Sequence, residues 1–250
     1  MWITDVIDES YRVAWGDLCH LKSNLLEVLL TGTVGPLLYL LAFGYGIGGS
    51  MGGGEEYVAF ILPGILALAT LSATFSTVSM RTLIQRLFYM SFDELLLCPI
   101  HVSAVVVGKT LAGMARVVIS CSIILLVGCL IVPDASVNVQ TVLILLLSAF
   151  MFSLLGFLAG IAVRRTNTLS LISAVVIVPM TFLCGTLFDV SALPSWAASV
   201  INVLPLTHVS ELVRSAMGSG TVPSDSLAVV FVYTALFFGL CWYLIRTNRC

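Results

Sequence analysis

The chain alternates long apolar runs with short polar segments. A helix needs about 20 mostly apolar residues to cross a bilayer. Runs that meet this length occur at residues 26–47, 57–80, 103–132, 141–163, 168–189 and 226–246. Turn-forming residues occupy the intervals between them, as in GYGIGGSMGGGEE and VPDASVN. The pattern predicts an all-α, polytopic membrane protein with six transmembrane helices, built as a single domain over residues 1–250.

A helical period of 3.6 residues precedes the first span, over residues 5–24. One face of this predicted helix holds Ile7, Tyr11, Ala14, Trp15, Leu18 and Leu21, and the other holds Asp5, Asp8, Glu9, Arg12, Gly16 and His20. A helix of this kind lies along the membrane surface, with Trp15 at the interface. Tyr11, Trp15 and Leu18 then either anchor the first span or also form a docking face for a partner.

A short polar interruption, SFDELLLCPIH, separates the second span from the third. Ser91 and Glu94 match a capping box ahead of an apolar run, and Pro99 disfavours helical geometry at Cys98. The sequence therefore predicts a short helix over 91–99. Its acidic start and its three leucines fit either a handle for a soluble partner or an ordinary connecting loop.

The segment between the fifth and sixth spans is semi-apolar and long. Pro194 suits the first turn of a helix, Trp196 suits a membrane interface, and Pro205 ends that helix before a second one over about 206–217. Residues 190–217 are thus expected to form two short re-entrant helices in the outer leaflet.

Composition agrees with a membrane protein. Hydrophobic residues make up 59% of the chain and charged residues 10%, and the mean hydropathy is +1.10. Soluble domains carry about 25% charged residues, so lipid is the expected surrounding. The net charge of −2 argues against a nucleic-acid partner, which requires a basic surface. The dispersed cysteines and histidines match no metal-ligand spacing, so no metal site is expected.

The distribution of Lys and Arg sets the expected orientation. If six spans alternate, one side holds Arg12, Lys22, Arg81, Arg86, Arg164, Arg165, Arg246 and Arg249, while the other holds only Arg214. Cytoplasmic loops carry an excess of these residues, so both termini are expected to be cytoplasmic.

Arg116 is ambiguous: it either lies inside the bilayer and faces a lumen, or precedes a third span that begins after it. The second alternative is favoured, because 117–133 is nearly long enough to span.

The order of these elements resembles the membrane subunit of type-2 ATP-binding-cassette (ABC) exporters, a family that includes permeases for nodulation factors, drugs and cell-surface polysaccharides. In the outer segment the resemblance is carried by Gly185, Phe188, Leu193, Pro194, Trp196, Leu204, Pro205, Glu211 and Arg214. In the stretch FDELLLCPIHVSAVVVGK it is carried by Glu94, Leu95, Pro99, Gly108 and Lys109. The stretch YVAFILPGILALA is similar to the start of the family's second span.

The resemblance implies partners for the chain. Two copies of this chain as a homodimer, or two related permeases, would assemble in the cell (inner) membrane with two cytosolic ABC ATPase subunits. The chain lacks the G-x-x-x-x-G-K-[ST] phosphate loop, so it would bind no cofactor itself, and ATP and Mg would belong to the ATPase. The short cytoplasmic helix would be the coupling helix, with Phe88, Ser91, Phe92, Asp93, Glu94, Leu95 and Pro99 as contact residues. Phe92 and the leucines would fill a groove of the ATPase. The cargo would be hydrophobic or amphipathic, such as a drug, a lipid or a lipid-linked glycan.

Two other classes compete with this interpretation. A secondary transporter or channel without an ATPase should show mid-membrane ionisable residues or two related halves, and no convincing repeat is visible. A membrane enzyme would need clustered acids or histidines within the spans. The stretch GGSMG at 48–52 matches a hydrolase elbow only formally, because it lies in a glycine-rich loop. No catalytic residue is therefore expected.

Overall fold

The computed structural model describes residues 2–42, 54–131, 138–183, 201–218 and 222–248, and its regular structure within these ranges is helical. The helices are α1 (Trp2–Ser23), α2 (Leu25–Leu41), α4 (Gly54–Leu87), α5 (Ser91–Leu97), α6 (Val102–Ile131), α7 (Val139–Ala162), α8 (Thr166–Leu183), α10 (Pro205–Met217) and α11 (Ser224–Asn248). The all-α prediction is thereby confirmed for the described part of the chain.

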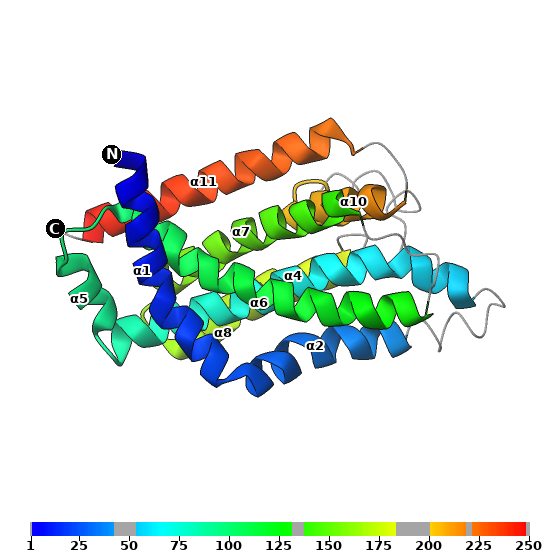
Figure 1. Ribbon diagram of the computed structural model, residues 1–250, viewed down its shortest axis with the longest axis horizontal. Coiled ribbons are helices and arrows are strands. Elements are labelled where there is room, and N and C mark those ends of the chain that lie inside the picture. Colours follow the sequence, from blue (N-terminus) through cyan, green and yellow to red (C-terminus); the bar gives the residue numbers. More distant parts are fainter. Residues whose placement is uncertain (1, 43–53, 132–137, 184–200, 219–221, 249–250) are drawn as a thin grey trace.

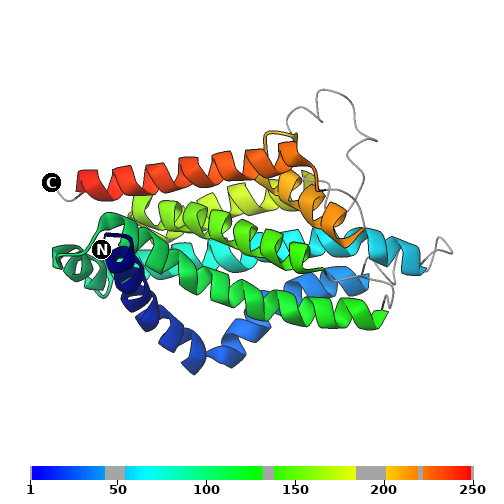
Figure 2. The same ribbon diagram turned by 45° about the horizontal axis from the view of Figure 1, so that its top comes forward.

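Figure 1 shows α2, α4, α6, α7, α8 and α11 running along the long axis of the molecule. The helix α1 crosses this bundle at one end, where α5 and the end of α11 also lie, and α10 lies at the opposite end (Figures 1 and 2). Four helices, α4, α6, α7 and α11, are long and apolar enough to cross a membrane, and α2 and α8 carry shorter apolar stretches. A polytopic membrane protein is confirmed, while the number of six spans stays a prediction.

The helix α4 forms the centre of the core and packs most extensively against α7. Two glycines of α7 allow this close packing: a Cβ on Gly156 would lie 2.8 Å from the carbonyl oxygen of Phe75, and one on Gly160 would lie 2.7 Å from that of Ser79. Small residues at helix crossings are typical of membrane proteins, because close backbone approach increases van der Waals contact. The α4–α7 pair is therefore the fixed frame against which the other helices are placed.

The helix α4 continues past residue 80, where the predicted span ends, as far as Leu87. Its final turns are amphipathic, and Leu83 is fully buried in a small cluster with Val163 and Leu169. This contact ties the end of α4 to the α7–α8 connection and sets the direction from which the chain enters α5.

Candidate functional site at the α5 end of the bundle

The helix α5 connects α4 to α6 at the end of the bundle where α1 lies (Figure 1). It begins at Ser91 and ends at Leu97, close to the predicted 91–99. Cys98 has extended backbone, with φ −67° and ψ 147°, because the following Pro99 disfavours helical geometry. The short helix and its stop signal are therefore as predicted.

The predicted cap of α5 is wrong. Met90, not Ser91, is the N-cap residue, and no side chain caps the helix. The Ser91 hydroxyl instead donates to the carbonyl oxygen of Gln85 at 3.5 Å. Met90 has a φ of 53°, in the left-handed region, which costs a non-glycine residue roughly 1–2 kcal/mol. The chain thus reverses through a tight turn between α4 and α5, and the surrounding packing must offset that cost.

The position of Phe92 also corrects a prediction. Its side chain is only 4% exposed, and its ring lies 6.2 Å from that of Phe157 on α7, in an edge-to-face arrangement. Such aromatic pairs contribute about 0.5–1.5 kcal/mol beyond the area they bury. Phe92 therefore fixes α5 to the core of the same chain, and it is not available to fill a groove of another protein.

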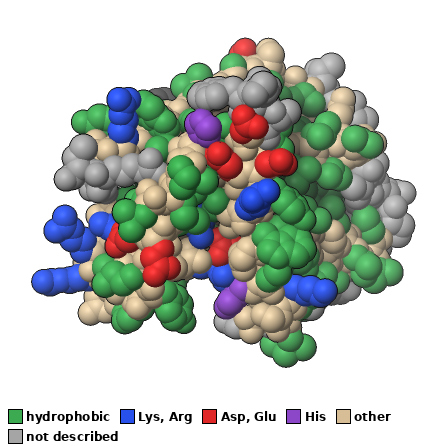
Figure 3. Space-filling view, turned by 60° about the vertical axis from the view of Figure 1, so that its left-hand side comes forward, with side chains coloured by type: hydrophobic (Ala, Val, Ile, Leu, Met, Phe, Trp, Pro, Cys, Tyr) green, Lys and Arg blue, Asp and Glu red, His purple; other side chains and the backbone are tan. Residues whose placement is uncertain are grey.

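A different set of side chains on and beside α5 is exposed. Phe88 is 67% exposed, Tyr89 71% and Leu97 86%, and Asp93 and Glu94 are exposed beside them. We call these five residues the α5 surface. Leu95 packs partly against the core, and Pro99 is exposed. The end of the molecule on which the α5 surface lies carries hydrophobic, basic and acidic side chains close together (Figure 3).

The helix α1 packs directly on α6 through a position that only glycine fits. A Cβ on Gly108 of α6 would lie 2.7 Å from Cβ of Val13 and 2.8 Å from the carbonyl oxygen of Ser10. Ala14 is fully buried in this contact zone, although the sequence placed it on the membrane face. The side of α1 that touches the protein is therefore distinct from both faces that its periodicity indicated.

The aromatic face of α1 points away from the bundle. Ile7, Tyr11 and Trp15 are each more than half exposed, the rings of Tyr11 and Trp15 lie 5.7 Å apart, and Leu18 is half-buried. Exposed aromatic side chains on an amphipathic helix are typical of helices at a membrane interface. The exposure of this face agrees with the expected interface helix, whose contact with lipid stays a prediction.

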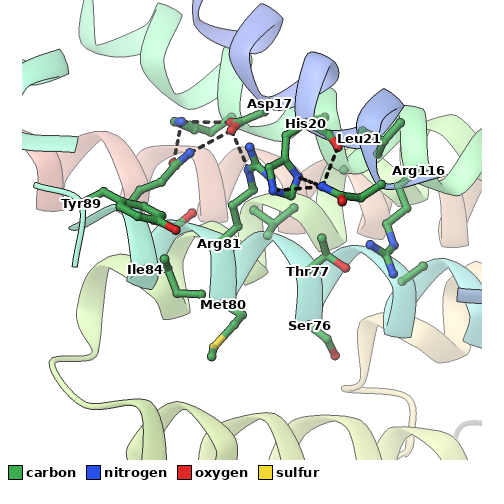
Figure 4. A pocket seen from close by; sticks show the side chains of 18 of the residues that line it. Asp17, His20, Leu21, Ser76, Thr77, Met80, Arg81, Ile84, Tyr89 and Arg116 are labelled. Atoms are coloured by element: carbon green, nitrogen blue, oxygen red, sulfur yellow. Dashed lines mark hydrogen bonds and ion pairs between the residues drawn. The ribbon is translucent and has the colours of Figure 1, made fainter. Parts of the chain in front are cut away.

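A buried carboxylate joins α1 to the two helices that flank α5. Asp17, 4% exposed, accepts from Nε of Arg81 on α4 at 2.6 Å and from Nζ of Lys109 on α6 at 3.0 Å. Gln85 completes the group: its amide nitrogen donates to Asp17 at 2.9 Å, and its amide oxygen accepts from Lys109 at 2.7 Å. We call Asp17, Arg81, Gln85 and Lys109 the Asp17 cluster. Figure 4 shows its hydrogen bonds.

The charge balance of the Asp17 cluster favours the ionised carboxylate. Burial alone would raise the pKa of Asp17, but the neighbouring Lys109 and Arg81 charges outweigh burial and hold the pKa below its usual value. Breaking such a pair is costly because it leaves an uncompensated charge in a poorly solvated place. The sequence pattern did not reveal the cluster, since its members are far apart in the chain.

A second polar contact fixes the start of α6. Glu9 of α1 accepts from the backbone N–H of His101 at 2.9 Å, and its carboxylate lies 3.0 Å from Nδ1 of the same residue. The backbone hydrogen bond and the His101 ring together lower the pKa of Glu9. The sequence pattern did not reveal this contact, because Glu9 and His101 are 92 residues apart in the chain.

Arg86 holds the end of α4 against the end of α7. Its guanidinium donates to the carbonyl oxygens of Ile161 and Val163, at the C-terminus of α7. A cation at this position satisfies carbonyl groups that have no partner within the helix and interacts favourably with the helix dipole. Phe92 packs α5 against α7, and Arg86 binds the end of α4 to the end of α7. The Asp17 cluster joins α1 to α4 and α6, the two helices on either side of α5 in the chain.

Arg116 lies near the midpoint of α6, which runs without a break from Val102 to Ile131. Both alternatives for Arg116 fit one unbroken helix, because the turns of α6 that precede Arg116 could stand outside the membrane. The side chain lines a cavity of about 750 Å³ that also adjoins the Asp17 cluster, as Figure 4 shows. Whether Arg116 sits inside a bilayer stays a prediction.

At the opposite end of the bundle, α10 begins at Pro205, which takes the first helical position. Glu211 accepts from the hydroxyl of Ser226 on α11 at 2.6 Å, and the Arg214 guanidinium lies 4.1 Å from the ring centroid of Phe60 on α4. These two signature residues thus fasten α10 to its neighbours. The other predicted residues of the outer signature, Gly185, Phe188, Pro194 and Trp196, lie outside the described residues.

No cluster of metal-ligating side chains is present in the described part of the chain: no three His, Cys, Asp or Glu side chains converge there. What the α5 end offers is instead an exposed, mixed apolar and acidic surface that is held rigidly against helices long enough to cross a membrane. Such an arrangement defines a polytopic membrane protein with an exposed apolar and acidic surface at one end.

Comparison with known proteins places the chain within this class. The family model for ABC-2 type transporters matches residues 20–217, so the chain belongs to the ABC-2 type transporter family. It is the membrane, or permease, subunit of an ABC transporter.

Three similar proteins illustrate the family. The chain is 26% identical over 229 residues to the inner membrane transport permease YadH of Escherichia coli K12, covering 90% of this chain and 89% of YadH. It is 26% identical to the daunorubicin resistance ABC transporter permease protein DrrB1 of Streptomyces coeruleorubidus, covering 79% of this chain and 70% of DrrB1. It is 25% identical to nodulation protein J of Sinorhizobium fredii NGR234, covering 88% and 86%.

Proposed function

We propose that this permease couples ATP hydrolysis by a separate cytosolic ABC ATPase to the export of a hydrophobic or amphipathic substrate. The α5 surface is the observation that carries the proposal. Phe88, Tyr89 and Leu97 are apolar and strongly exposed, and they lie on α5 or in the turn before it, between the contacts of Arg86 and Phe92. An exposed apolar surface with a charged rim is typical of a protein–protein contact.

The contacts behind α5 explain how force on this surface would reach the spans. Because α5 is the direct link between α4 and α6, displacement of α5 moves the ends of both helices. The Asp17 cluster connects the same two helices to α1, so α1 would move with them. The ATPase could bias the permease only by binding its two states with different affinity. We expect Asp93 and Glu94 to meet basic residues of the ATPase.

The proposed assembly contains two ATPase subunits and a second permease copy. Ser76 and Met80 of α4 are exposed at the open side of the cavity described above. Hydroxyl groups on a spanning helix normally face a protein interior or a water-filled path rather than lipid. A second copy placed against this side would close the path, which supports the homodimer.

The α5 end is proposed to face the cytoplasm of a cell whose inner membrane holds the protein. The excess of Lys and Arg in the segments at this end supports that orientation, and a relative is named an inner membrane permease. The name of another relative refers to daunorubicin resistance, which supports a substrate with an apolar body.

Reconstitution tests the proposed coupling. The permease would be co-expressed with the ABC ATPase from its genomic neighbourhood, purified, and placed in liposomes for ATP-hydrolysis measurements. We expect the pair Asp93→Lys with Glu94→Lys to abolish co-purification and the stimulation of hydrolysis by the permease. The control Asp225→Lys, a single charge reversal at the opposite end, should retain both. Transport that follows an ion gradient without any ATPase would instead support the secondary transporter.

A further inference from the structure

The cavity beside the Asp17 cluster has the size and position of a ligand site. Its volume of about 750 Å³ lies within the roughly 300–1,000 Å³ of small-molecule sites. It follows α4 from Ser72 to Gln85, about 20 Å along a helix that rises 1.5 Å per residue, and continues to Tyr89 in the turn before α5. The cavity therefore extends from the α5 end toward the middle of the bundle.

One wall of the cavity is unusually polar for a span. Ser72, Ser76 and Thr77 of α4 line it; Ser72 and Ser76 share a helical face because they are four residues apart, and Thr77 borders that face. Figure 4 shows Ser76 and Thr77 on the turns of α4 that precede Arg81. Ionisable side chains within a span are typical of paths for polar groups, and these hydroxyls add polar groups beside Arg81 and Arg116 of the same cavity. Apolar side chains of Leu21, Met80 and Ile84 line the same cavity.

The cavity also carries an excess of positive charge. Arg81, Lys109 and Arg116 line it together with a single carboxylate, that of Asp17. The carboxylate already binds two of these cations, Arg81 and Lys109. Arg116 lies seven residues after Lys109, so the two share a face of α6 at a separation of about 10 Å. Figure 4 shows the Arg116 guanidinium apart from the Asp17 cluster, on the side where Thr77 lies.

We propose that this cavity binds the anionic headgroup of a lipid-like molecule, with Arg116 and Thr77 as the headgroup contacts. A guanidinium is well suited to a phosphate or carboxylate because it presents several donors in one plane, and the Thr77 hydroxyl adds a further donor. The apolar wall accommodates the start of the acyl chains. The proposal rests on the proposed export function only in assigning this ligand as substrate: it narrows the amphipathic substrates of that function to anionic ones.

Lipid binding to the purified permease tests the site without any ATPase. The permease, in a neutral detergent, would be titrated with fluorescently labelled phosphatidylglycerol and with phosphatidylcholine that carries the same chains and label. We expect tighter binding of phosphatidylglycerol, weakened by salt. Arg116→Gln should lower its affinity roughly tenfold or more, and Arg116→Lys should retain much of it. Thr77→Val, which keeps the side-chain shape, should lower the affinity about threefold to tenfold.

The control is Arg165→Gln, which removes one exposed cation from the α7–α8 connection at the α5 end. It should bind phosphatidylglycerol like the wild type. Should Arg116→Gln not fold, as judged by size-exclusion chromatography and thermal unfolding, Thr77→Val and the difference in affinity between the two lipids carry the test.

Several outcomes would overturn the site. These are equal affinity for the two lipids, unchanged affinity in Arg116→Gln and Thr77→Val, or an equal loss in Arg165→Gln. Competition by glycerol 3-phosphate at the affinity of the lipid would show a soluble anion as the ligand and would equally overturn it. Each of these results leaves ATPase coupling standing, and a permease that recruits no ATPase would leave the lipid result standing.

Discussion

Asp17 of α1 and Lys109 of α6 lie 3.0 Å apart, carboxylate oxygen to ammonium nitrogen, although 92 residues separate them in the chain. Arg81 of α4 binds the same carboxylate. The helices α4 and α6, which precede and follow α5, are therefore both bound to the buried Asp17 carboxylate of α1, the helix that lies across the bundle. Any rearrangement that moves α4 relative to α6 must carry α1 along or break this cluster.

Asp17 should stabilise the folded permease through its two ion pairs. Asp17→Ala should lower the free energy of unfolding by about 3 kcal/mol, the lower end of the range for breaking a buried pair, because Arg81 is partly exposed. Circular dichroism during unfolding in detergent would measure the change. Lys109→Met should cost less in the Asp17→Ala background than in the wild type, since its partner is already gone. Strictly additive losses would contradict the direct pairing.

The pH dependence of unfolding should follow the same carboxylate. The pKa of Asp17 is lowered in the folded protein, so the unfolded chain binds the proton more readily. The stabilisation is therefore complete well above the unfolded pKa of about 3.9 and is lost as the pH falls toward the folded pKa. The wild type should lose stability below about pH 5 more steeply than Asp17→Asn. Parallel curves for the two proteins in this range would rule out the assigned role.

Glycine at position 108 should be required for the docking of α1. Gly108→Ala places a methyl group 2.8 Å from the backbone oxygen of Ser10, and such overpacking costs about 1–3 kcal/mol. We expect faster proteolysis of α1 and a lower unfolding midpoint. Gly16→Ala is the matched control, because nothing lies within 4 Å of its Cβ position. Alanine is also the better helix former there, by about 1 kcal/mol. Equal behaviour of the two variants would contradict the close approach.

The sequence predicts the helices because their signals are local. Hydrophobic run length located the apolar helices, Pro99 located the end of α5, and Pro205 located the start of α10 within one residue. The extension of α4 to Leu87 was missed because its last turns are amphipathic rather than uniformly apolar. Local patterns therefore fix most of the element order and leave the ends uncertain.

The candidate site was less accessible from sequence because it depends on contacts between distant helices. Periodicity separates the apolar and polar positions of α1, but it does not tell Ala14, which packs on α6, from Trp15, which is exposed. Phe92 looked like a contact for a partner because a seven-residue helix has no periodicity that identifies its buried side. The one available signal for Asp17 was an acid followed, far along the chain, by cations near the ends of two spans.

The two ends of α5 should separate stability from partner binding. Phe92→Ala removes a buried aromatic side chain, and it should destabilise the permease by about 3–5 kcal/mol. Leu97→Ala changes a side chain that is 86% exposed, so it should alter stability by no more than about 0.5 kcal/mol. We expect Leu97→Ala to weaken co-purification of the ATPase while the unfolding midpoint stays unchanged. The reverse pattern, with a destabilised Leu97→Ala and a stable Phe92→Ala, would show that the buried and exposed sides of α5 have been interchanged.

Accessibility labelling can establish which end of the bundle faces the cytoplasm. The α7–α8 connection lies at the α5 end, and α11 begins at the opposite end (Figure 1). Single cysteines at Val222 and Arg165 would be compared in intact cells with a membrane-impermeant thiol reagent, with the unsubstituted protein as background. A cysteine at Met51, which lies outside the described residues, tests the same side as Val222. We expect labelling at 51 and 222 but not at 165, because Arg164 and Arg165 belong to the basic, cytoplasmic side. Labelling at 165 in intact cells would place the α5 surface outside, where no ATP-driven partner could reach it, and the coupling proposal would then fail together with the orientation.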